Sequence, residues 1–264
     1  MKAEIETHIA DVDAFYRPII RDAHLRLSGG SQLLSSFEQS VDAYRKIGRR
    51  QVSGIIERVN ELTVAHKLLT DPRLASAQIA YEPQIVPGPK FDFVVSAPGK
   101  PTLYIEVKTV SPQPTNDATS WQKATYRRRL ITPGTVFIVD EKAFGAEIFG
   151  NDFAARSSIM KYALQTETKL AAHLEFEPGR GALVICGNGV SWEPDLLEDF
   201  ADYYRHGRHR ADDPFTAMEQ AVEANSPKLR RSLEGFGLMI RAQNALVPTT
   251  WTYPVTGPLK FQKN

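Results

Sequence analysis

The sequence lacks several features that would assign it directly to a class of proteins. Its 264 residues include one cysteine, Cys186, so no internal disulfide can form and a disulfide-stabilised secreted scaffold is excluded. No apolar run approaches the length of a membrane-spanning helix, and residues 1–6 do not resemble a signal peptide. We therefore expect a cytoplasmic protein with no membrane partner.

An excess of one charge is also missing. The chain carries 32 basic residues of the Lys and Arg types against 31 acidic ones, so its net charge is +1. Any binding to nucleic acid must therefore come from local basic patches rather than from the overall charge. The sequence contains no His-Glu-x-x-His, no Cys-x-x-Cys and no phosphate-binding Gly-x-x-x-x-Gly-Lys motif, so nothing in it indicates a zincin, a zinc finger or a P-loop enzyme.

Residues 1–50 are expected to form a helical N-terminal extension. Apolar residues recur every three to four positions over residues 3–27, with an interruption or kink at Pro18, and again over residues 32–47. The pair Gly29-Gly30 separates the two helices. Such an extension could also mediate a homodimer.

The next part of the chain, residues 51–190, predicts an α/β core. The elements expected there follow the order helix, three strands, helix, strand, which corresponds to a mixed sheet flanked by helices. The expected elements are, in chain order, residues 51–70, 78–86, 91–96, 102–110, about 154–174, and 181–187.

Two further segments are expected outside this core pattern. Residues 111–150 form an insertion between the third strand and the second helix, because the insertion starts with a loop-forming composition. Residues 191–264 form a C-terminal α/β extension that packs on the core, with helices near 196–204 and 214–224 and a strand near 236–241. The Pro-containing tail, 247–264, is expected to be irregular.

Three charged residues lie in two of the expected strands, where burying a charge is costly unless something binds it. They are Asp92, Glu106 and Lys108. The turn-forming segment 97–101 makes the two runs a hairpin. Pairing Ser96 with Thr102 then places Asp92 directly opposite Glu106, with Cβ atoms about 4.5–5.5 Å apart.

This register determines which side chains share a face. Lys108 is two residues beyond Glu106 and points the same way, whereas Val107 points into the core. Two carboxylates at such a distance repel each other, and a hard cation that prefers oxygen ligands, Mg²⁺ or Mn²⁺, removes the repulsion. The carbonyl of Val107, expected at the edge of the sheet, is a further candidate ligand.

Lys108 could stabilise charge that develops on a phosphoryl group or orient a metal-bound water. The alternative is a surface strand pair in which Glu106 and Lys108 form an ordinary ion pair. The apolar residues on both sides of these charges favour the metal site.

Asp92 and Glu106-Val107-Lys108 resemble the motif of the PD-(D/E)xK nuclease superfamily, and the expected order of elements over residues 50–190 resembles its restriction-endonuclease-like αβββαβ core. Phe91 stands where the family name has proline. The resemblance implies a nuclease that depends on Mg²⁺ or Mn²⁺ and cleaves phosphodiester bonds of nucleic acid. DNA is favoured over RNA, because most of the family cuts DNA.

The resemblance also implies further site residues. The family usually adds an acid from its first core helix, where Glu57 and Glu61 are candidates, and we prefer Glu61 as a metal ligand. Relatives place a Lys or Gln of the second core helix near the scissile phosphate, which points to Gln165, with Lys161 beside it. Nucleic-acid contacts are expected from the basic run Arg127, Arg128 and Arg129, which follows the catalytic strand and has Trp121 and Tyr126 nearby.

Two other functions remain open at this point. The chain could be a catalytically inactive member of the family that binds nucleic acid or acts as a scaffold. It could also use the carboxylate pair on another substrate, as a glycosidase does. The intact set of Asp92, Glu106 and Lys108 argues against the first, and the lysine with the order of elements argues against the second.

Overall fold

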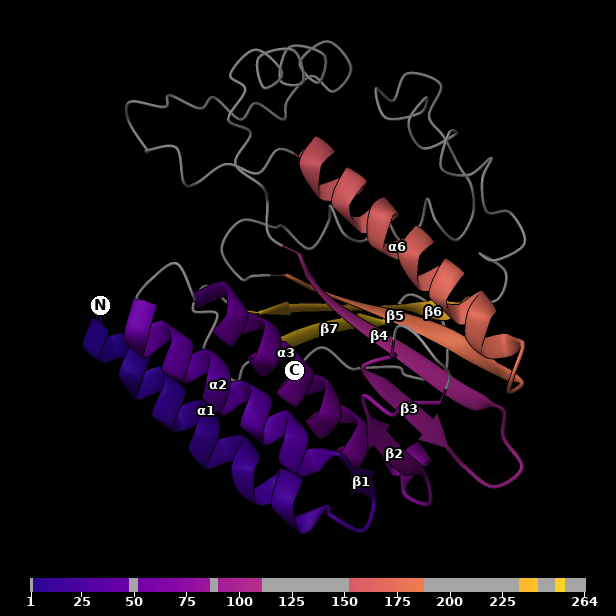
Figure 1. The fold of residues 1–264 in the computed structure, drawn as a ribbon, viewed down its shortest axis with the longest axis horizontal. Coiled ribbons are helices and arrows are strands. Elements are labelled where there is room, and N and C mark those ends of the chain that lie inside the picture. Colours follow the sequence, from indigo (N-terminus) through magenta and orange to yellow (C-terminus); the bar gives the residue numbers. More distant parts are fainter. Residues whose placement is uncertain are drawn as a thin grey trace.

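Seven strands form one mixed sheet, with helices on both of its sides, in the computed structural model of the chain (Figure 1). The α/β class predicted from the sequence is therefore confirmed. The structure describes residues 2–47, 52–85, 90–110, 152–187, 233–241 and 250–254. The predicted insertion at 111–150, with its run Arg127, Arg128 and Arg129, and the predicted helices near 196–204 and 214–224 lie outside these residues.

The described elements follow the predicted order. The helices are α1 (Lys2–Asp22), α2 (Gly30–Ile47), α3 (Val52–Thr70), the 3-10 helix η2 (Pro72–Leu74) and α6 (Asp152–Leu174). The strands are β1 (Leu27–Ser28), β2 (Gln78–Tyr81), β3 (Phe93–Ser96), β4 (Thr102–Val110), β5 (Gly179–Gly187), β6 (Leu233–Arg241) and β7 (Thr250–Pro254).

The N-terminal region differs from the prediction in its details. Helix α1 continues through Pro18, so the predicted interruption is absent, and it ends at Asp22 instead of residue 27. After the helix ends, the side chain of Arg26 donates hydrogen bonds to the carbonyl oxygens of Leu69 and Leu74. These bonds tie the chain after α1 to the end of α3.

The strands lie in the sheet in their chain order, from β1 to β7. Strands β2, β3 and β4 are antiparallel neighbours, whereas β4, β5 and β6 run parallel to one another and β7 returns antiparallel to β6. The two-residue strand β1 was not predicted, because it is defined only by its parallel pairing with β2. The tail was predicted to be irregular, and β7 shows this to be wrong for Thr250–Pro254.

The register predicted for the central hairpin is confirmed. Phe93 pairs with Ile105, and Val95 pairs with Leu103, as the pairing of Ser96 with Thr102 requires. The strand is shorter than expected, however, since β3 begins at Phe93 and Asp92 lies in the bend just before it.

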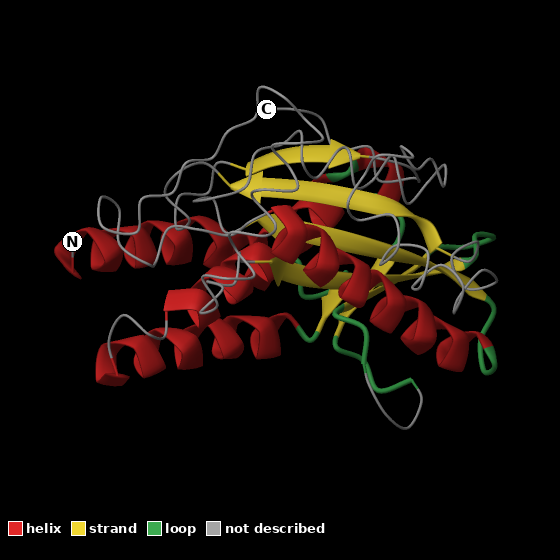
Figure 2. Cartoon of the chain, turned by 90° about the horizontal axis from the view of Figure 1, so that it is seen from above, coloured by secondary structure: helices red, strands yellow, loops and turns green. Residues whose placement is uncertain are grey.

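The two faces of the sheet carry two separate hydrophobic clusters. Leu103, Ile105 and Val107 of β4 join the larger cluster, which α1, α2 and α3 cover. Tyr104 belongs to the smaller cluster beneath α6, with Phe91, Val94 and Leu170. Figures 1 and 2 show this layering, with α1 to α3 on one side of the sheet and α6 crossing the other. The alternation along β4 therefore places Glu106 and Lys108 on the α6 side.

Gly29 provides a test of the packing between the first helices and the sheet. Its φ is +78°, and a Cβ atom there would lie 2.7 Å from the carbonyl oxygen of Tyr81. We expect Gly29→Ala to lower the free energy of unfolding by about 2–4 kcal/mol, because it adds left-handed backbone strain to a steric clash. Urea denaturation measures this loss.

Gly99 is the matched control for that substitution. Its φ is +67°, but nothing lies within 4 Å of a Cβ atom placed on it. We expect Gly99→Ala to cost only about 1–2 kcal/mol, the contribution of the backbone conformation alone. Equal losses for the two variants would show that the contact with Tyr81 adds nothing.

Candidate active site

Glu106 is the centre of the charged cluster that the hairpin brings under α6. Its side chain is charged, yet the residue is only 4% exposed and its neighbours on the strand are apolar. Both carboxylate oxygens are paired with cations. Lys108 Nζ lies 2.5 Å from Oε1, and Lys169 Nζ contacts Oε2. The predicted convergence of Glu106 and Lys108 on one face is thus present, and Lys169 is a third member that the sequence did not suggest.

Lys169 reaches this site from α6. Its ammonium group lies 4.6 Å from the centroid of the Phe91 ring, a cation–π contact that is stronger where water is excluded. The backbone carbonyl of Lys169 is 2.9 Å from Nδ1 of His173, whose ring packs edge-on against Phe91. The lysine is therefore held at its backbone and along its side chain.

The two residues predicted for the site from α6, Gln165 and Lys161, have no described contact with Glu106. Gln165 is exposed, one helical turn before Lys169, and the side chain of Lys161 is outside the described part of the chain. Residues 161, 165 and 169 share one helix face, since they are four apart. Extending the predicted pair by one more turn is the sequence signal that could have identified Lys169.

Asp92 lies in the bend just before β3 and is half-buried. Its Oδ2 accepts a hydrogen bond of 2.6 Å from the backbone N–H of Val107. Burial, together with the nearby carboxylates of Glu106 and Glu61, raises the pKa of Asp92 to about 7, even though Val107 and Lys108 act in the opposite direction. Asp92 therefore lies in the electrostatic field of two other acids. The hairpin register predicted the one from Glu106.

Val107 was predicted to offer its carbonyl at a sheet edge. Strand β4 is internal, between β3 and β5, so that description was wrong. However, β3 begins only at Phe93, and the N–H of Val107 is bonded to the Asp92 side chain in place of a strand partner. The N–H and the carbonyl of one strand residue point to the same neighbour, so the Val107 carbonyl also faces the Asp92 side.

Glu61 lies on α3 and forms a separate network next to Asp92. Its carboxylate accepts hydrogen bonds of 2.7 Å from both Arg58 and the Tyr81 hydroxyl. Burial raises the pKa of Glu61, although Arg58 and Tyr81 oppose the shift. Glu57, the other candidate acid, is exposed. Glu61 is thus the buried one of the two candidate acids, and two side chains already hold its oxygens.

The pKa of Lys108 is raised. Burial by itself would lower it, but the carboxylates of Glu106 and Asp92, with Tyr162, more than offset that effect. Lys108 is therefore fully charged at neutral pH. A charged amine at this position can neutralise an anionic group that approaches the two acids.

The donor set can be compared with the needs of a divalent cation. Among the described residues, no three side chains of the His, Cys, Asp or Glu types lie together as a metal-holding group. The nearest candidates are the carboxylates of Asp92 and Glu106, which interact electrostatically, and the carbonyl of Val107, which faces the Asp92 side. This set fits Mg²⁺ or Mn²⁺, because Mg²⁺ commonly uses one or two carboxylates and keeps several waters.

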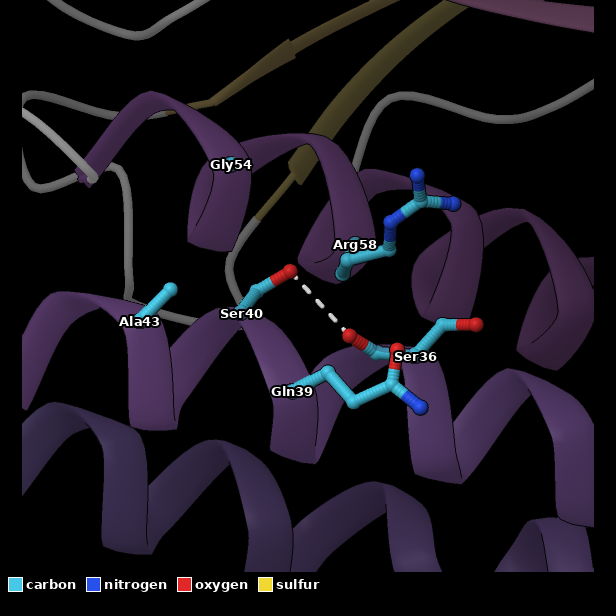
Figure 3. Close-up of a pocket in the computed structure, with 6 residues that line it drawn as sticks. All are labelled: Ser36, Gln39, Ser40, Ala43, Gly54 and Arg58. Atoms are coloured by element: carbon cyan, nitrogen blue, oxygen red, sulfur yellow. Dashed lines mark hydrogen bonds between the residues drawn. The ribbon is translucent and has the colours of Figure 1, made fainter.

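A polar cavity of about 210 Å³ lies elsewhere, between α2 and α3. Its lining consists of Ser36, Gln39, Ser40, Ala43, Gly54 and Arg58 (Figure 3). The Ser40 hydroxyl donates to the Ser36 carbonyl, and Arg58 directs its guanidinium group away from these serines, where it binds Glu61. Because the cavity has no carboxylate, the charged cluster around Glu106 is the better candidate for the active site.

Comparisons with known proteins add no family assignment. No protein-family model matches the chain, and no curated protein or solved structure matches it either. Within the part of the chain that the structure describes, no helix is both long enough and apolar enough to span a membrane.

Proposed function

We propose that this protein is a metal-dependent nuclease of the PD-(D/E)xK type, which hydrolyses phosphodiester bonds of nucleic acid and prefers DNA to RNA. One observation carries the proposal. Glu106 and Lys108 form an ion pair on one face of β4, and Asp92, just before β3, accepts the N–H of Val107 and lies in the electrostatic field of both. Two acids and a lysine suit a divalent cation and an anionic substrate.

The proposal assigns a role to each group. Asp92, Glu106 and the Val107 carbonyl would hold Mg²⁺ or Mn²⁺, which supplies polarisation of the phosphate and activation of water when it is bound. Lys108 would donate a hydrogen bond to the phosphoryl oxygen on which charge grows. Glu61 would complete the acid set: its carboxylate acts electrostatically on Asp92, and it is itself held by Arg58.

The topology supports a restriction-endonuclease-like core for this site. Helix α3, strands β2 to β4, helix α6 and strand β5 follow the αβββαβ order. The three strands before α6 are antiparallel neighbours, and the strand after it pairs in parallel with β4. The candidate residues then lie on the central hairpin, next to both flanking helices.

A second function is favoured by the ion pairs of Glu106. Since both of its oxygens contact lysines, the cluster could also be a buried structural network in a catalytically inactive module that binds nucleic acid. Such a protein would bind nucleic acid in chelator and in Mn²⁺ alike, and would cleave nothing.

The two functions are separated by a cleavage assay. The protein is incubated with plasmid, single-stranded DNA and RNA, each with Mn²⁺, with Mg²⁺ and with chelator. The nuclease proposal requires cleavage that stops in chelator and that is absent from the Glu106→Gln variant purified in the same way. Binding without cleavage under every metal condition would instead establish the inactive module.

Metal binding should also be visible as a pH-dependent stabilisation. A cation that binds only the folded protein raises its free energy of unfolding by about 2.7 kcal/mol at 100 times its dissociation constant. At pH 8 Asp92, whose pKa is about 7, is ionised and ready to bind. We expect Mn²⁺ to raise the thermal midpoint more at pH 8 than at pH 5.5, because the cation must displace a proton at the lower pH.

The control for this measurement is Asp92→Asn, which should lose most of the Mn²⁺-dependent rise at pH 8. An equal rise in the variant and the original protein would place the cation at another site.

A further inference from the structure

We propose that Lys169 is a positioning residue that closes one oxygen of Glu106, so that a divalent cation exchanges with Lys108 at the other oxygen. This inference rests on the proposed function, and it specifies how the metal site is regulated. The metal would enter at Oε1 of Glu106, and the lysine released there would be Lys108.

The two lysines that neutralise Glu106 are held differently. The side chain of Lys169 is 12% exposed and lies against the Phe91 ring. The backbone carbonyl of the same residue contacts His173. The side chain of Lys108 is 29% exposed. Moving Lys169 away would forfeit a partly desolvated cation–π contact, whereas Lys108 makes no such contact with the residues that the structure describes.

The positions of the contacts also assign the two oxygens. Oε2 faces Lys169 and, behind it, Phe91 of the smaller hydrophobic cluster. Oε1 faces Lys108, which the carboxylate of Asp92 also influences. Because Lys169 holds Oε2, a cation shared between Asp92 and Glu106 would use Oε1, the oxygen that Lys108 contacts.

The exchange has a consequence for substrate binding. Before the metal enters, Lys108 is paired with Glu106 and its charge is largely satisfied. Once a divalent cation takes Oε1, Lys108 is repelled by it and becomes available to a phosphate of the nucleic acid. Metal and nucleic acid would then bind cooperatively, because each favours the state in which Lys108 has left Glu106.

Two matched substitutions test which oxygen the metal uses. Lys108→Met and Lys169→Met remove the same charge from opposite oxygens of one carboxylate and keep an unbranched side chain. Mn²⁺ affinity is measured by calorimetry without nucleic acid, together with the thermal midpoint of each variant. Lys108→Met should bind Mn²⁺ roughly tenfold more tightly, because a competing cation has gone.

Lys169→Met should bind Mn²⁺ no more tightly than the original protein, since Oε2 does not face the metal. Lys169→Arg keeps the charge and should retain the original affinity. The reverse ranking, in which Lys169→Met tightens binding and Lys108→Met does not, would overturn the inference.

A spectroscopic experiment gives an answer that does not depend on these variants. In protein carrying isotopically labelled lysine, Mg²⁺ is titrated and the side-chain signals of both lysines are followed by NMR, with Lys→Arg variants for assignment. The Lys108 signal should shift and the Lys169 signal should remain. A shift of Lys169 alone would refute the inference and leave the nuclease proposal standing, whereas no Mg²⁺-dependent change anywhere in the spectrum would refute the nuclease proposal itself.

Discussion

Replacing Asp92 by asparagine is expected to lower the cleavage rate by about 10³-fold or more and to leave the fold at least as stable in chelator. The rate falls because the metal site loses a charged ligand, a loss comparable to removing a strong electrostatic stabiliser of the transition state. Stability is kept because the asparagine oxygen still accepts the N–H of Val107. The substitution also removes the cost of a buried negative charge close to the carboxylates of Glu106 and Glu61.

The effect on stability should depend on pH in a defined direction. The pKa of Asp92 is raised from 3.8 to about 7 in the folded protein. Between these values the folded state holds a proton that the unfolded chain has released, so the stability of the original protein falls as the pH rises from about 4 to about 7. Asp92→Asn removes this fall, and its advantage in urea denaturation should appear at pH 8 and vanish near pH 4.

Asp92→Ala is the matched comparison for this prediction. It removes the carboxylate and also the acceptor for Val107, and a buried N–H without a partner costs about 1–3 kcal/mol. The alanine variant should therefore be less stable than the asparagine variant. If Asp92→Asn itself lowers the unfolding midpoint strongly at pH 8, then Asp92 is a structural residue and does not serve as a metal ligand.

Replacing Lys108 by alanine is expected to reduce the single-turnover cleavage rate by roughly 10²-fold, the size found for losing one donor that stabilises a transition state. Charge on the phosphoryl oxygens grows as the reaction proceeds, so most of the lysine's effect lies in the transition state. Affinity for nucleic acid should fall far less, because several basic residues share the electrostatic attraction. Rate at saturating substrate and binding by fluorescence anisotropy are measured on the same preparations.

Lys100→Ala is a suitable control, since Lys100 is exposed in the turn of the same hairpin. It should leave both the rate and the affinity unchanged. If Lys108→Ala weakens binding severely while the rate at saturation stays the same, Lys108 only binds phosphate and the proposed role in the transition state is wrong.

The sequence was sufficient for the local parts of the candidate site. Turn residues at 97–101 fix where the hairpin reverses, and the period of two in a strand then fixes which side chains share a face. For this reason the pairing of Phe93 with Ile105, the inward direction of Val107 and the shared face of Glu106 and Lys108 could all be predicted.

The order and type of the main elements also follow from local patterns. Helices α2 and α3 begin and end within two residues of the predicted bounds, because apolar spacing and flanking glycine or proline act within one segment. Strand β2 ended earlier than predicted, at Tyr81, because Glu82 turns the chain with a φ of +42°. A polar residue at that conformation carries no clear signal in the sequence.

Contacts between distant segments were decided by the tertiary structure alone. The pairing of Lys169 with Glu106, the hydrogen bond of Tyr81 to Glu61, and strands β1 and β7 each join segments of different elements. Each depends on how α3, α6 and the terminal segments pack on the sheet, and no single segment's spacing encodes that packing. Local periodicity therefore determined the hairpin and the shared face of Glu106 and Lys108, whereas the packing of α6 on the sheet brought Lys169 to Glu106 as a second cation.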